Sequence, residues 1–521
     1  MLTVLASVYE KNGLVDLLKR LAAKDELKVI ATGSTCQYLK DNGFNCVKVE
    51  DMTGFPEILG GRVKTLHPRV FAGILARGTE EDRKTLATHE ISEIDVVIVN
   101  LYPFEAKQAL NLKLAELIEF IDIGGVSLIR AAAKNFARVS ILGNESQYEE
   151  FASVFEAGKL DEAYRRKLAA EAFDQTRNYD SAIAKALHDA SQGEKIADFP
   201  KNVSLNLDQL TPLRYGENPH QAAAWYGPLQ NAGDITFPPF EQLAGKELSA
   251  NNIVDCYALV RILRDVSQSS SGFTACIIKH NNPCGVAIGK TCEEAFDRAY
   301  NTDPLSAFGG VYGFSGTVTE ALAKKIVQGF VEIVAALDFE PAAIEVLTTK
   351  KNMRVLKLKP TLLAIEARPV RIKDMGDFGF IVEKDVEAPV TVEKFEVVCG
   401  DPKLLESLHD DIGFAWNVVR HLTSNAIAVV KDGNGVGFGI GQTSRVASVK
   451  LALAQAGDKA RGGILASDAF FPAVDSIEEA AAAGISIIVQ PGGSIKDKDV
   501  IEKAKTMGIT MLLTGQRCFR H

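Results

Sequence analysis

Short apolar runs alternate with helical patterns in the first part of the chain. The runs cover residues 2–7, 27–31, 95–101 and 139–142, and helical spacing follows the first two from about Gly13 and Thr35. Short continuous apolar runs of this kind are typical of strands buried in a parallel sheet. Residues 161–190 are rich in Ala, Leu, Glu, Lys and Arg, which predicts a long helix. The pattern therefore predicts an α/β domain built from βαβ units.

The periodicity stops at a polar stretch, residues 191–206, which contains Gly193 and Pro200. We place a domain boundary there and expect domains at residues 1–199 and 200–521. In the second domain, residues 426–431 and 436–440 flank turn formers, which predicts a hairpin. Near the C-terminus, residues 463–513 again alternate strand-like and helical patterns, as in βαβ units.

Composition narrows the classes of function. A chain of 521 residues is expected to form about two to four folding units. Its net charge of −9 argues against nucleic acid or an anionic membrane as partner, because either would need a broad basic face. No apolar stretch approaches the roughly 18 residues of a membrane span and the N-terminus has no basic leader, so a cytoplasmic location is expected. The eight cysteines form no CxxC pair and the histidines no HExxH motif, which predicts a reduced compartment and no structural metal.

Hydroxyl groups and cations follow the first two predicted strands. Ser7 and Lys11 come after the first strand, and Thr32, Ser34 and Thr35 lead into the helix after the second. Backbone N–H groups at a helix N-terminus favour an anion, so these loops are candidates for a phosphate site. The alternative is that Ser and Thr only cap the helix.

The stretch LGGRVKTLHP, residues 59–68, places Arg62, Lys64, Thr65 and His67 after two glycines. A Gly-Gly turn lets the backbone approach a ligand closely, and alternate side chains then point the same way. An exposed strand with solvated charges is the alternative. His67, which precedes a proline, is expected to be structural.

Three groups that can carry protons come from the next motifs. Tyr102 ends the buried strand, Asp122 precedes a Gly-Gly turn, and Lys134 lies one helical turn beyond Arg130, so that Arg130 and Lys134 share a face. Tyr, Lys and Asp around a phosphate pocket could transfer protons without a metal. A surface lysine and a structural tyrosine would be the alternative.

In the second domain, two pairs of residues are candidates for binding and catalysis. Arg214 beside Tyr215 can bind an anion and stack on a flat ring. Lys279 and His280 follow the apolar residues 275–278 and precede turn formers, so they are expected where a strand ends and the chain reverses. There a histidine suits base catalysis on an amine, and a lysine can stabilise an oxyanion. A structural histidine with satisfied hydrogen bonds is the alternative.

Two cofactor signatures are incomplete. Pro283 and Cys284 resemble the start of the PCxxC zinc signature of nucleobase deaminases, but the second thiolate would fall at Ala287. Residues 435–441 carry glycine at every second position, which fits a strand closely approached by another backbone better than a dinucleotide-binding GxGxxG. Zinc and nicotinamide cofactors are therefore disfavoured. The cationic and aromatic C-terminus, residues 516–521, is either frayed or folded into a ligand site.

Ten motifs in this order resemble one enzyme family, which joins AICAR transformylase to IMP cyclohydrolase, along essentially the whole chain. They are TGFPEILGGRVKTLHP, VNLYPF, DIGGVSLIRAAAKN, LRYGENPHQ, KHNNPCG, DPLSAFGG, SNAIAVV, GIGQTSR, ASDAFFP and the RCFRH end. The resemblance implies an α/β fold: an N-terminal methylglyoxal-synthase-like parallel-sheet domain followed by two cytidine-deaminase-like α/β subdomains without zinc. It also implies a homodimer that acts on small molecules, with neither nucleic acid nor membrane as partner.

The same resemblance implies two reactions. The second domain would transfer a formyl group from 10-formyltetrahydrofolate, the co-substrate, to the 5-amino group of AICAR. The first domain would close the ring of the product, FAICAR, with loss of water to give IMP. His280 would accept the amine proton, while Lys279 and Asn425 position the reacting groups. The residues implied to hold AICAR or border the folate are Arg214, Tyr215, Asn252, Phe308, Gly309, Asp468, Arg517 and Phe519.

In the cyclohydrolase, the resemblance implies that Lys64, Tyr102, Asp122 and Lys134 act in catalysis, with no metal. The residues implied to bind phosphate and base are Ser7, Lys11, Ser34, Thr35, Arg62 and Thr65. The first loop departs from the family's SVSDKTGL, since residues 7–14 read SVYEKNGL, and a serine stands at position 34 where glycine is common. The rival hypothesis is a nucleotide-binding protein that has lost its chemistry, which the retained lysines and His280 disfavour.

Overall fold

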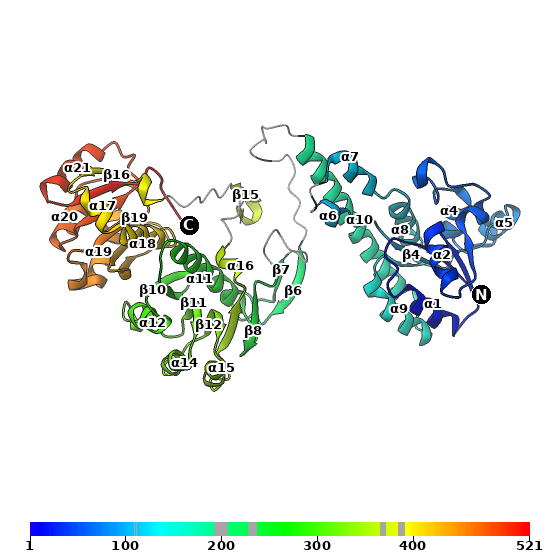
Figure 1. Ribbon diagram of the computed structural model, residues 1–521, viewed down its shortest axis with the longest axis horizontal. Coiled ribbons are helices and arrows are strands. Elements are labelled where there is room, and N and C mark those ends of the chain that lie inside the picture. Colours follow the sequence, from blue (N-terminus) through cyan, green and yellow to red (C-terminus); the bar gives the residue numbers. More distant parts are fainter. Residues whose placement is uncertain are drawn as a thin grey trace. The chain divides into compact units, whose positions relative to one another are not determined.

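The computed structural model describes residues 1–108, 110, 112–191, 199, 207–227, 237–364, 371–383 and 391–521. The chain forms two compact units, Met1–Leu205 (unit 1) and Asn206–His521 (unit 2), which Figure 1 colours from blue to teal and from green to red. The expected domain boundary between residues 199 and 200 falls in residues 192–206, of which only Phe199 is described.

In the described residues of unit 1, five parallel strands form one sheet in the order β3-β2-β1-β4-β5. The strands are β1 Leu2–Val8, β2 Leu27–Ala31, β3 Cys46–Lys48, β4 Val96–Asn100 and β5 Ser140–Leu142. The four predicted runs are confirmed as β1, β2, β4 and β5. The hydrophobic pattern misses β3, because only one of its three residues is buried.

The helices of unit 1 connect these strands and bury one apolar face each against the sheet or against one another. For example, α1 buries Leu14, Leu17, Leu18 and Leu21. The long predicted helix is confirmed as α10, which packs against α8. The helices are α1 Leu14–Ala22, α2 Gly33–Asp41, α3 Val49–Thr53, α4 Pro68–Leu75, α5 Glu80–Thr88, α6 Phe104–Gln108, α7 Leu114–Leu117, α8 Gly124–Lys134, α9 Tyr148–Glu156 and α10 Glu162–Ser191, with short 3-10 turns η1 Leu59–Gly61, η2 Ile118–Phe120 and η3 Glu145–Gln147. Because parallel strands end at one edge of a sheet, the loops after β1, β2 and β4 meet there.

In its described residues, unit 2 contains a mixed sheet of 12 strands in the order β16-β21-β20-β19-β17-β18-β10-β9-β11-β12-β13-β8. The strands are β8 Phe240–Ala244, β9 Phe273–Lys279, β10 Asn282–Gly289, β11 Val311–Val318, β12 Ile333–Phe339, β13 Arg354–Leu358, β16 Glu396–Cys399, β17 Ile427–Lys431, β18 Asn434–Gly439, β19 Ile464–Ser467, β20 Ile487–Gln490 and β21 Thr510–Leu513. Two small antiparallel pairs stand apart from this sheet: β6 Asp208–Leu213 with β7 Ala223–Gly227, and β14 Arg371–Asp374 with β15 Phe380–Glu383.

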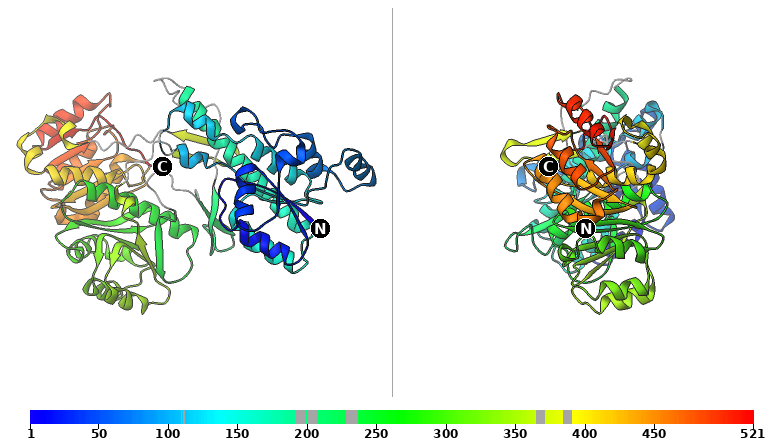
Figure 2. Two further views of the ribbon diagram at one scale, coloured as in Figure 1. Left: turned by 45° about the vertical axis from the view of Figure 1, so that its right-hand side comes forward. Right: turned by 90° about the vertical axis from the view of Figure 1, so that its left-hand side faces the viewer.

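The two halves of the large sheet repeat one topology. From the centre outward the strands run β10-β9-β11-β12-β13-β8 in the first half and β18-β17-β19-β20-β21-β16 in the second. The antiparallel pair β10 and β18 joins the halves, with Ala287 opposite Asn434. Figure 2 shows the first half in green and the second in yellow to red. The two expected α/β subdomains are therefore confirmed, and their likeness to deaminases stays a prediction.

The helices repeat in the same order as the strands. Those of the first half are α11 Ala250–Gln268, α12 Cys292–Tyr300, α14 Glu320–Ile326 and α15 Pro341–Thr348; those of the second are α18 His409–Val419, α19 Arg445–Ala456, α20 Asp475–Ala482 and α21 Asp497–Thr506. The shorter elements are α13 Pro304–Ala307, α16 Thr361–Ala364, α17 Lys403–Ser407, η4 Gly376–Phe378, η5 Val392–Lys394 and η6 Gly457–Ala460. Among the described helices, none combines the length and apolar character that crossing a bilayer would require.

The predicted hairpin is the pair β17–β18, with Asp432 and Gly433 in the turn. A Cβ atom on Gly437 would lie 2.1 Å from the carbonyl oxygen of Ala452, and one on Gly439 would lie 2.0 Å from that of Ser448. The backbone of α19 therefore packs directly on β18, which confirms the interpretation of its alternating glycines. The succession β19, α20, β20, α21, β21 confirms the βαβ pattern predicted for the end of the chain.

Candidate active sites

The loops after β1 and β2 meet through a cluster of hydroxyl groups. The hydroxyl of Thr32 lies 3.4 Å from that of Ser7, and the buried hydroxyl of Thr35 donates to the carbonyl oxygen of Val8 at 3.2 Å. Thr35 thus joins the start of α2 to the end of β1. Ser34, in the first turn of α2, is exposed. The structure brings Ser7, Ser34 and Thr35 together at the edge where an anion would meet the helix N-terminus.

Asn100, at the end of β4, holds the loop that departs from the family pattern. Its amide oxygen accepts from the backbone nitrogens of Tyr9 and Glu10, and its amide nitrogen donates to the Glu10 carbonyl at 2.6 Å. The Tyr9 ring meets that of Tyr102 edge-on, with 5.4 Å between centroids. The Lys11 ammonium donates to the Tyr9 carbonyl at 3.2 Å. Lys11 and Tyr102 therefore lie at one edge of the sheet.

The loop of residues 59–65 carries two cations, Arg62 and Lys64, of which only Arg62 forms an ion pair with another described residue. Arg62 is exposed, and its Nε donates to Glu119 Oε2 at 3.3 Å within an ion pair. Thr65 is buried against the start of α8, where a Cβ on Gly124 would lie 2.6 Å from the Thr65 hydroxyl. Any larger residue at position 124 would therefore require the Thr65 side chain to shift. The segment forms a 3-10 turn and a loop, so the alternative of an exposed strand is wrong.

Asp122 caps the start of α8 and lies near Lys64. Its Oδ1 accepts from the Gly125 nitrogen at 2.7 Å, and its own nitrogen donates to the Tyr179 hydroxyl at 2.8 Å. Burial raises the pKa of Asp122 above its ordinary value, against the opposing effects of the Gly125 N–H group and the Lys64 charge. A carboxyl with a raised pKa in the field of an ammonium group suits proton transfer.

Lys134 lies at the other end of the same helix. Because α8 spans 11 residues, its two ends are about 15 Å apart at 1.5 Å per residue. Lys134 and Arg130 both line an open cavity of about 630 Å³ between α8 and α10, which confirms that they share a face. The Arg130 guanidinium lies 5.3 Å from the ring centroid of Phe173 there. Within unit 1, the structure therefore does not bring Lys134 to Asp122.

In unit 2, His280 lies at the tip of the β9–β10 hairpin. Lys279 pairs with Asn282 in the sheet, so His280 and Asn281 form a two-residue turn. This confirms the predicted reversal at the strand end. The Lys279 ammonium donates to the carbonyl oxygens of Phe308 and Gly309, at 3.0 and 3.1 Å. Lys279, His280 and the Phe308–Gly309 loop are therefore neighbours.

Arg214 and Tyr215 lie beside the start of α11. The guanidinium of Arg214 lies 5.2 Å from the Tyr215 ring centroid, and the Arg214 nitrogen donates to the Leu248 carbonyl at 2.9 Å. Asn252, in the first turn of α11, is buried and donates to Glu332 Oε2 at 3.1 Å. The exposed arginine is thus available to an anion, whereas the Asn252 amide already has a protein partner.

Asp468 is a buried anchor for three segments. Its carboxylate forms an ion pair with Arg445 and accepts from the Ala426 nitrogen at 3.1 Å and from the Ser424 hydroxyl. Its carbonyl accepts from the Cys518 nitrogen at 3.0 Å. Asn425, between two of these contacts, donates its amide to the Gln442 carbonyl at 2.7 Å. Because Asp468 is fully buried, its direct contact with folate stays a prediction, and its visible role is to hold residues 424–426.

The C-terminus is folded onto this anchor. The Ser424 nitrogen donates to the Arg520 carbonyl at 2.9 Å, which together with the Cys518 contact fixes the last residues. The Arg517 guanidinium lies 5.4 Å from the Phe519 ring centroid, the same pairing as in Arg214 and Tyr215. The tail is therefore folded rather than frayed, and its part in a ligand site stays a prediction.

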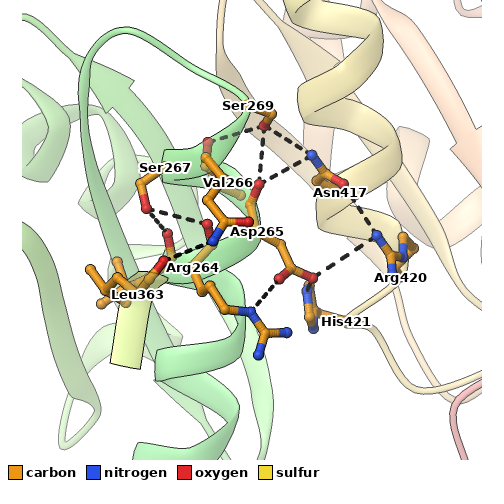
Figure 3. Close-up of polar contacts among 11 residues, drawn as sticks. Arg264, Asp265, Val266, Ser267, Ser269, Leu363, Asn417, Arg420 and His421 are labelled. Atoms are coloured by element: carbon orange, nitrogen blue, oxygen red, sulfur yellow. Dashed lines mark hydrogen bonds and ion pairs between the residues drawn. The ribbon is translucent and has the colours of Figure 1, made fainter. Parts of the chain in front are cut away.

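A buried polar network, shown in Figure 3, links α11 to the end of α18. Asp265 accepts from His421 Nε2 at 2.9 Å and from Arg264 Nε at 2.8 Å, and Arg420 lies 4.0 Å away. Burial alone would raise the pKa of Asp265, but the His421 hydrogen bond and the two arginine charges hold it well below the usual value. Burial lowers the pKa of His421, so the ring is neutral at neutral pH. This network fixes the segment that leads into Asn425.

The described residues contain no group of three His, Cys, Asp or Glu side chains placed to hold a metal. The Cys284 thiol of the incomplete zinc signature is buried and donates to the Ile277 carbonyl at 3.5 Å. Burial raises the pKa of Cys284 to about 12, so it is not a ready thiolate ligand. The expectation of a metal-free enzyme stays a prediction.

Comparisons with known proteins show the family to which the chain belongs. The model of the AICARFT/IMPCHase bienzyme matches residues 132–455, and that of the MGS-like domain matches residues 13–127. Two relatives, each called "Bifunctional purine biosynthesis protein PurH", come from Synechococcus elongatus and Desulfitobacterium hafniense. Each is 44% identical, over 521 and 525 residues, and each match covers 99% of both chains. The chain belongs to the AICARFT/IMPCHase bienzyme family.

This bienzyme family is the one that the ten motifs resemble, so the resemblance is confirmed. The MGS-like match lies within unit 1 and confirms the type of the N-terminal domain. Among solved structures, "Crystal structure of ForH" is 32% identical, covering 36% of this chain and 97% of that chain with a TM-score of 0.32.

Several residues that contact the candidate site residues were not singled out from the sequence. Glu119 contacts Arg62, and Tyr179 contacts Asp122, each across 57 positions of the chain. Arg445, which ends the GIGQTSR motif, pairs with the buried Asp468. Asn100 stands inside the VNLYPF motif, and its position at a strand end could have pointed to it.

Proposed function

We propose that the chain carries out two successive steps of purine biosynthesis on one ribotide. Unit 2 transfers the formyl group of 10-formyltetrahydrofolate to the 5-amino group of AICAR, and unit 1 closes the ring of FAICAR to give IMP. The observation that carries this proposal is the presence of two separate clusters, each combining cations with a proton-carrying group. Lys64 and Asp122 lie together in unit 1, and Lys279 and His280 in unit 2.

In formyl transfer, the amine nitrogen of AICAR attacks the formyl carbon, and the bond from that carbon to the folate nitrogen breaks. His280 takes the proton that the amine loses, and the folate nitrogen gains one as it leaves. Lys279 and Asn425 position the reacting groups. The exposed Arg214 with Tyr215, and Arg517 with Phe519, hold the ribotide by charge and stacking. An aromatic amine is a weak nucleophile, so orientation must supply much of the acceleration.

Asn252, Phe308, Gly309 and Asp468 complete the proposed transformylase site. Phe308 and Gly309 border the folate, in keeping with their contact to the Lys279 ammonium. We place Asn252 next to the ribotide because it lies in the first turn of α11, and Arg214 and Tyr215 contact the start of that helix. Asp468 holds the two residues that flank Asn425, by accepting from the Ser424 hydroxyl and the Ala426 nitrogen.

In ring closure, the carboxamide nitrogen of FAICAR attacks the formyl carbon and water leaves. Asp122, Lys64 and Tyr102 transfer the protons, since the raised pKa of Asp122 lets it both accept and return a proton. We include Lys134 among the catalytic residues only because it stands in the family motif. The residues proposed to bind phosphate and base are Ser7, Lys11, Ser34, Thr35, Arg62 and Thr65.

We further propose that the enzyme is a cytoplasmic homodimer that needs no metal and contacts neither nucleic acid nor membrane. The net charge of −9 supports the last part, because a polyanionic partner would need a basic face. The homodimer rests on the family resemblance. Light scattering of the purified chain tests it, since a monomer at assay concentration would end that proposal.

One assay separates the enzyme from a binding protein that has lost its chemistry. The purified chain is mixed with AICAR and 10-formyltetrahydrofolate, with and without EDTA, and both tetrahydrofolate and IMP are followed. We expect both products, and the same rates with the chelator. No product at an enzyme concentration close to that of substrate would leave only the binding role, and a loss of rate with EDTA would overturn the metal-free proposal.

A further inference from the structure

The turn that carries His280 has an unfavourable sequence for its shape. His280 and Asn281 have φ angles of 49° and 64°, so both central residues of this two-residue turn are left-handed. Such turns favour Asn-Gly, and a histidine at a positive φ is uncommon. The histidine is therefore held in place by something other than the preference of the turn itself.

A carboxylate on α11 supplies that support. Asp255 Oδ1 accepts from the Asn281 backbone nitrogen at 2.7 Å. Burial raises the pKa of Asp255, against the opposing effects of the Asn281 N–H group and of the nearby His280 and Lys279 charges. The bond to Asn281 places Asp255 directly beside the turn that carries His280, on a helix whose first turn also carries Asn252.

The second half of the sheet contains an internal counterpart. Asp411 on α18 accepts from the nitrogens of Asp432 and Gly433, at 2.9 and 2.7 Å, at the tip of the β17–β18 hairpin. These turn residues have φ angles of 53° and 64°. Both halves thus use a helix carboxylate to fix a left-handed hairpin turn. The second turn has the favourable Asp-Gly sequence and no imidazole.

We propose that Asp255 is a positioning residue for formyl transfer, which fixes His280 by accepting the hydrogen bond of the Asn281 nitrogen. The proposal rests on the function proposed above for His280. When the acceptor is lost, the turn relaxes from its left-handed conformation and the imidazole leaves the position from which it reaches the amine. Binding of the ribotide by Arg214, Tyr215 and Arg517 is not affected, because none of them contacts this turn in the hydrogen bonds described above.

The test compares Asp255→Ala, Asp255→Asn and the matched control Asp411→Ala. We expect Asp255→Ala to lower kcat for formyl transfer about 30-fold or more, with KM for AICAR changed less than about threefold. Asp255→Asn keeps an oxygen that can accept the bond, so it should recover kcat to within about fivefold of the wild type. Asp411→Ala should lose stability but keep kcat within about twofold. Cyclisation of supplied FAICAR should be unchanged in all three.

An additional variant keeps the proposal testable if Asp255→Ala folds poorly. In the double variant Asp255→Ala/Asn281→Gly, the glycine adopts the left-handed conformation without strain. This double variant should therefore regain part of the kcat that Asp255→Ala loses. The proposal is overturned if Asp255→Ala keeps kcat within about threefold, if Asp255→Asn is as impaired as Asp255→Ala, or if Asp411→Ala loses as much kcat. A wild type without formyl transfer would instead refute the proposed function and would be seen before any variant is compared.

Discussion

The amide oxygen of Asn282 accepts two hydrogen bonds from Thr423, at 2.9 Å from its nitrogen and 3.1 Å from its hydroxyl. Asn282 starts β10 in the first half of the large sheet, and Thr423 precedes β17 in the second. One side chain thus joins the two halves between His280 and Asn425. The proposed transformylase site lies where two copies of one topology meet, and neither half alone contains all its groups.

Asn282→Ala should therefore lower kcat/KM for formyl transfer about tenfold or more, because it releases the segment that carries Asn425 from the His280 hairpin. Cyclisation of FAICAR should not change. Asn434→Ala is the matched control, since Asn434 starts the corresponding strand β18 and its buried amide oxygen has no hydrogen-bond partner among the described residues. Steady-state assays of both steps check this, and equal losses in both variants would contradict it.

Glu119→Gln should lower KM for FAICAR by up to about fivefold, because Arg62 is then free to turn toward the phosphate. Arg62→Ala should raise the same KM, and adding Glu119→Gln to it should have no further effect. The double-mutant cycle on KM measures this coupling. A rise in KM for Glu119→Gln would mean that the ion pair itself positions Arg62 for the substrate.

The raised pKa of Asp122 sets the pH dependence of ring closure. If its carboxylate accepts a proton, the rate should fall at low pH along a limb whose midpoint lies above the ordinary aspartate value of 3.8. Asp122→Asn should remove this limb and lower kcat about 100-fold or more. Asp82→Asn, at a partly buried carboxylate that pairs with Arg77 elsewhere in unit 1, should leave the profile unchanged. An unaltered acid limb in Asp122→Asn would assign it to another group.

The neutral His421 makes the stability of unit 2 depend on pH. Burial lowers its pKa in the folded state below the ordinary value of 6.5, so below that pH the unfolded chain binds a proton that the folded chain does not. The stability advantage of the wild type over His421→Gln should be constant above pH 6.5 and shrink below it, by at most about 1.4 kcal/mol per pH unit. A charged pair with Asp265 would give the opposite sign.

Urea unfolding followed by tryptophan fluorescence measures this difference. Both tryptophans of the chain, Trp225 and Trp416, belong to unit 2, so the signal reports on that unit alone. Arg261 and Arg420 also face the imidazole and disfavour its protonation. An advantage of the wild type that grows as pH falls would contradict the neutral assignment.

Hydrophobic periodicity predicted four of the five strands of unit 1, the β17–β18 hairpin and the βαβ units at the end of the chain, but it missed β3 and most strands of the first half of unit 2. The alternating glycines of β18 indicated that another backbone lies on that strand, and α19 does. Periodicity says which face of an element is buried, but it does not say which polar group a given side chain meets. In the sequence, nothing distinguishes Asp255 and Asp411 from other carboxylates on helices. Only the fold shows that each contacts a hairpin turn.

The motifs predict two groups of site residues but not how the residues of each group lie. They predict Lys134 in one group with Asp122, and within unit 1 the length of α8 separates the two residues. They also included Asp468 among ligand contacts, although its carboxylate is buried on Arg445. Residues of one motif can lie far apart along a helix, as Asp122 and Lys134 do, or a motif residue can be buried in an ion pair, as Asp468 is. The sequence of a motif shows neither.

The central claim is that two independent sites act in succession on one ribotide. His280→Ala should lose formyl transfer about 100-fold or more and still cyclise supplied FAICAR, and Lys64→Met should do the reverse. The most direct measurement is IMP formation from AICAR and 10-formyltetrahydrofolate by an equal mixture of the two variants. We expect each variant alone to make almost no IMP and the mixture to make it after a lag, as FAICAR passes from one protein to the other. A mixture that stays inactive, or a His280→Ala variant that has also lost ring closure, would contradict the account.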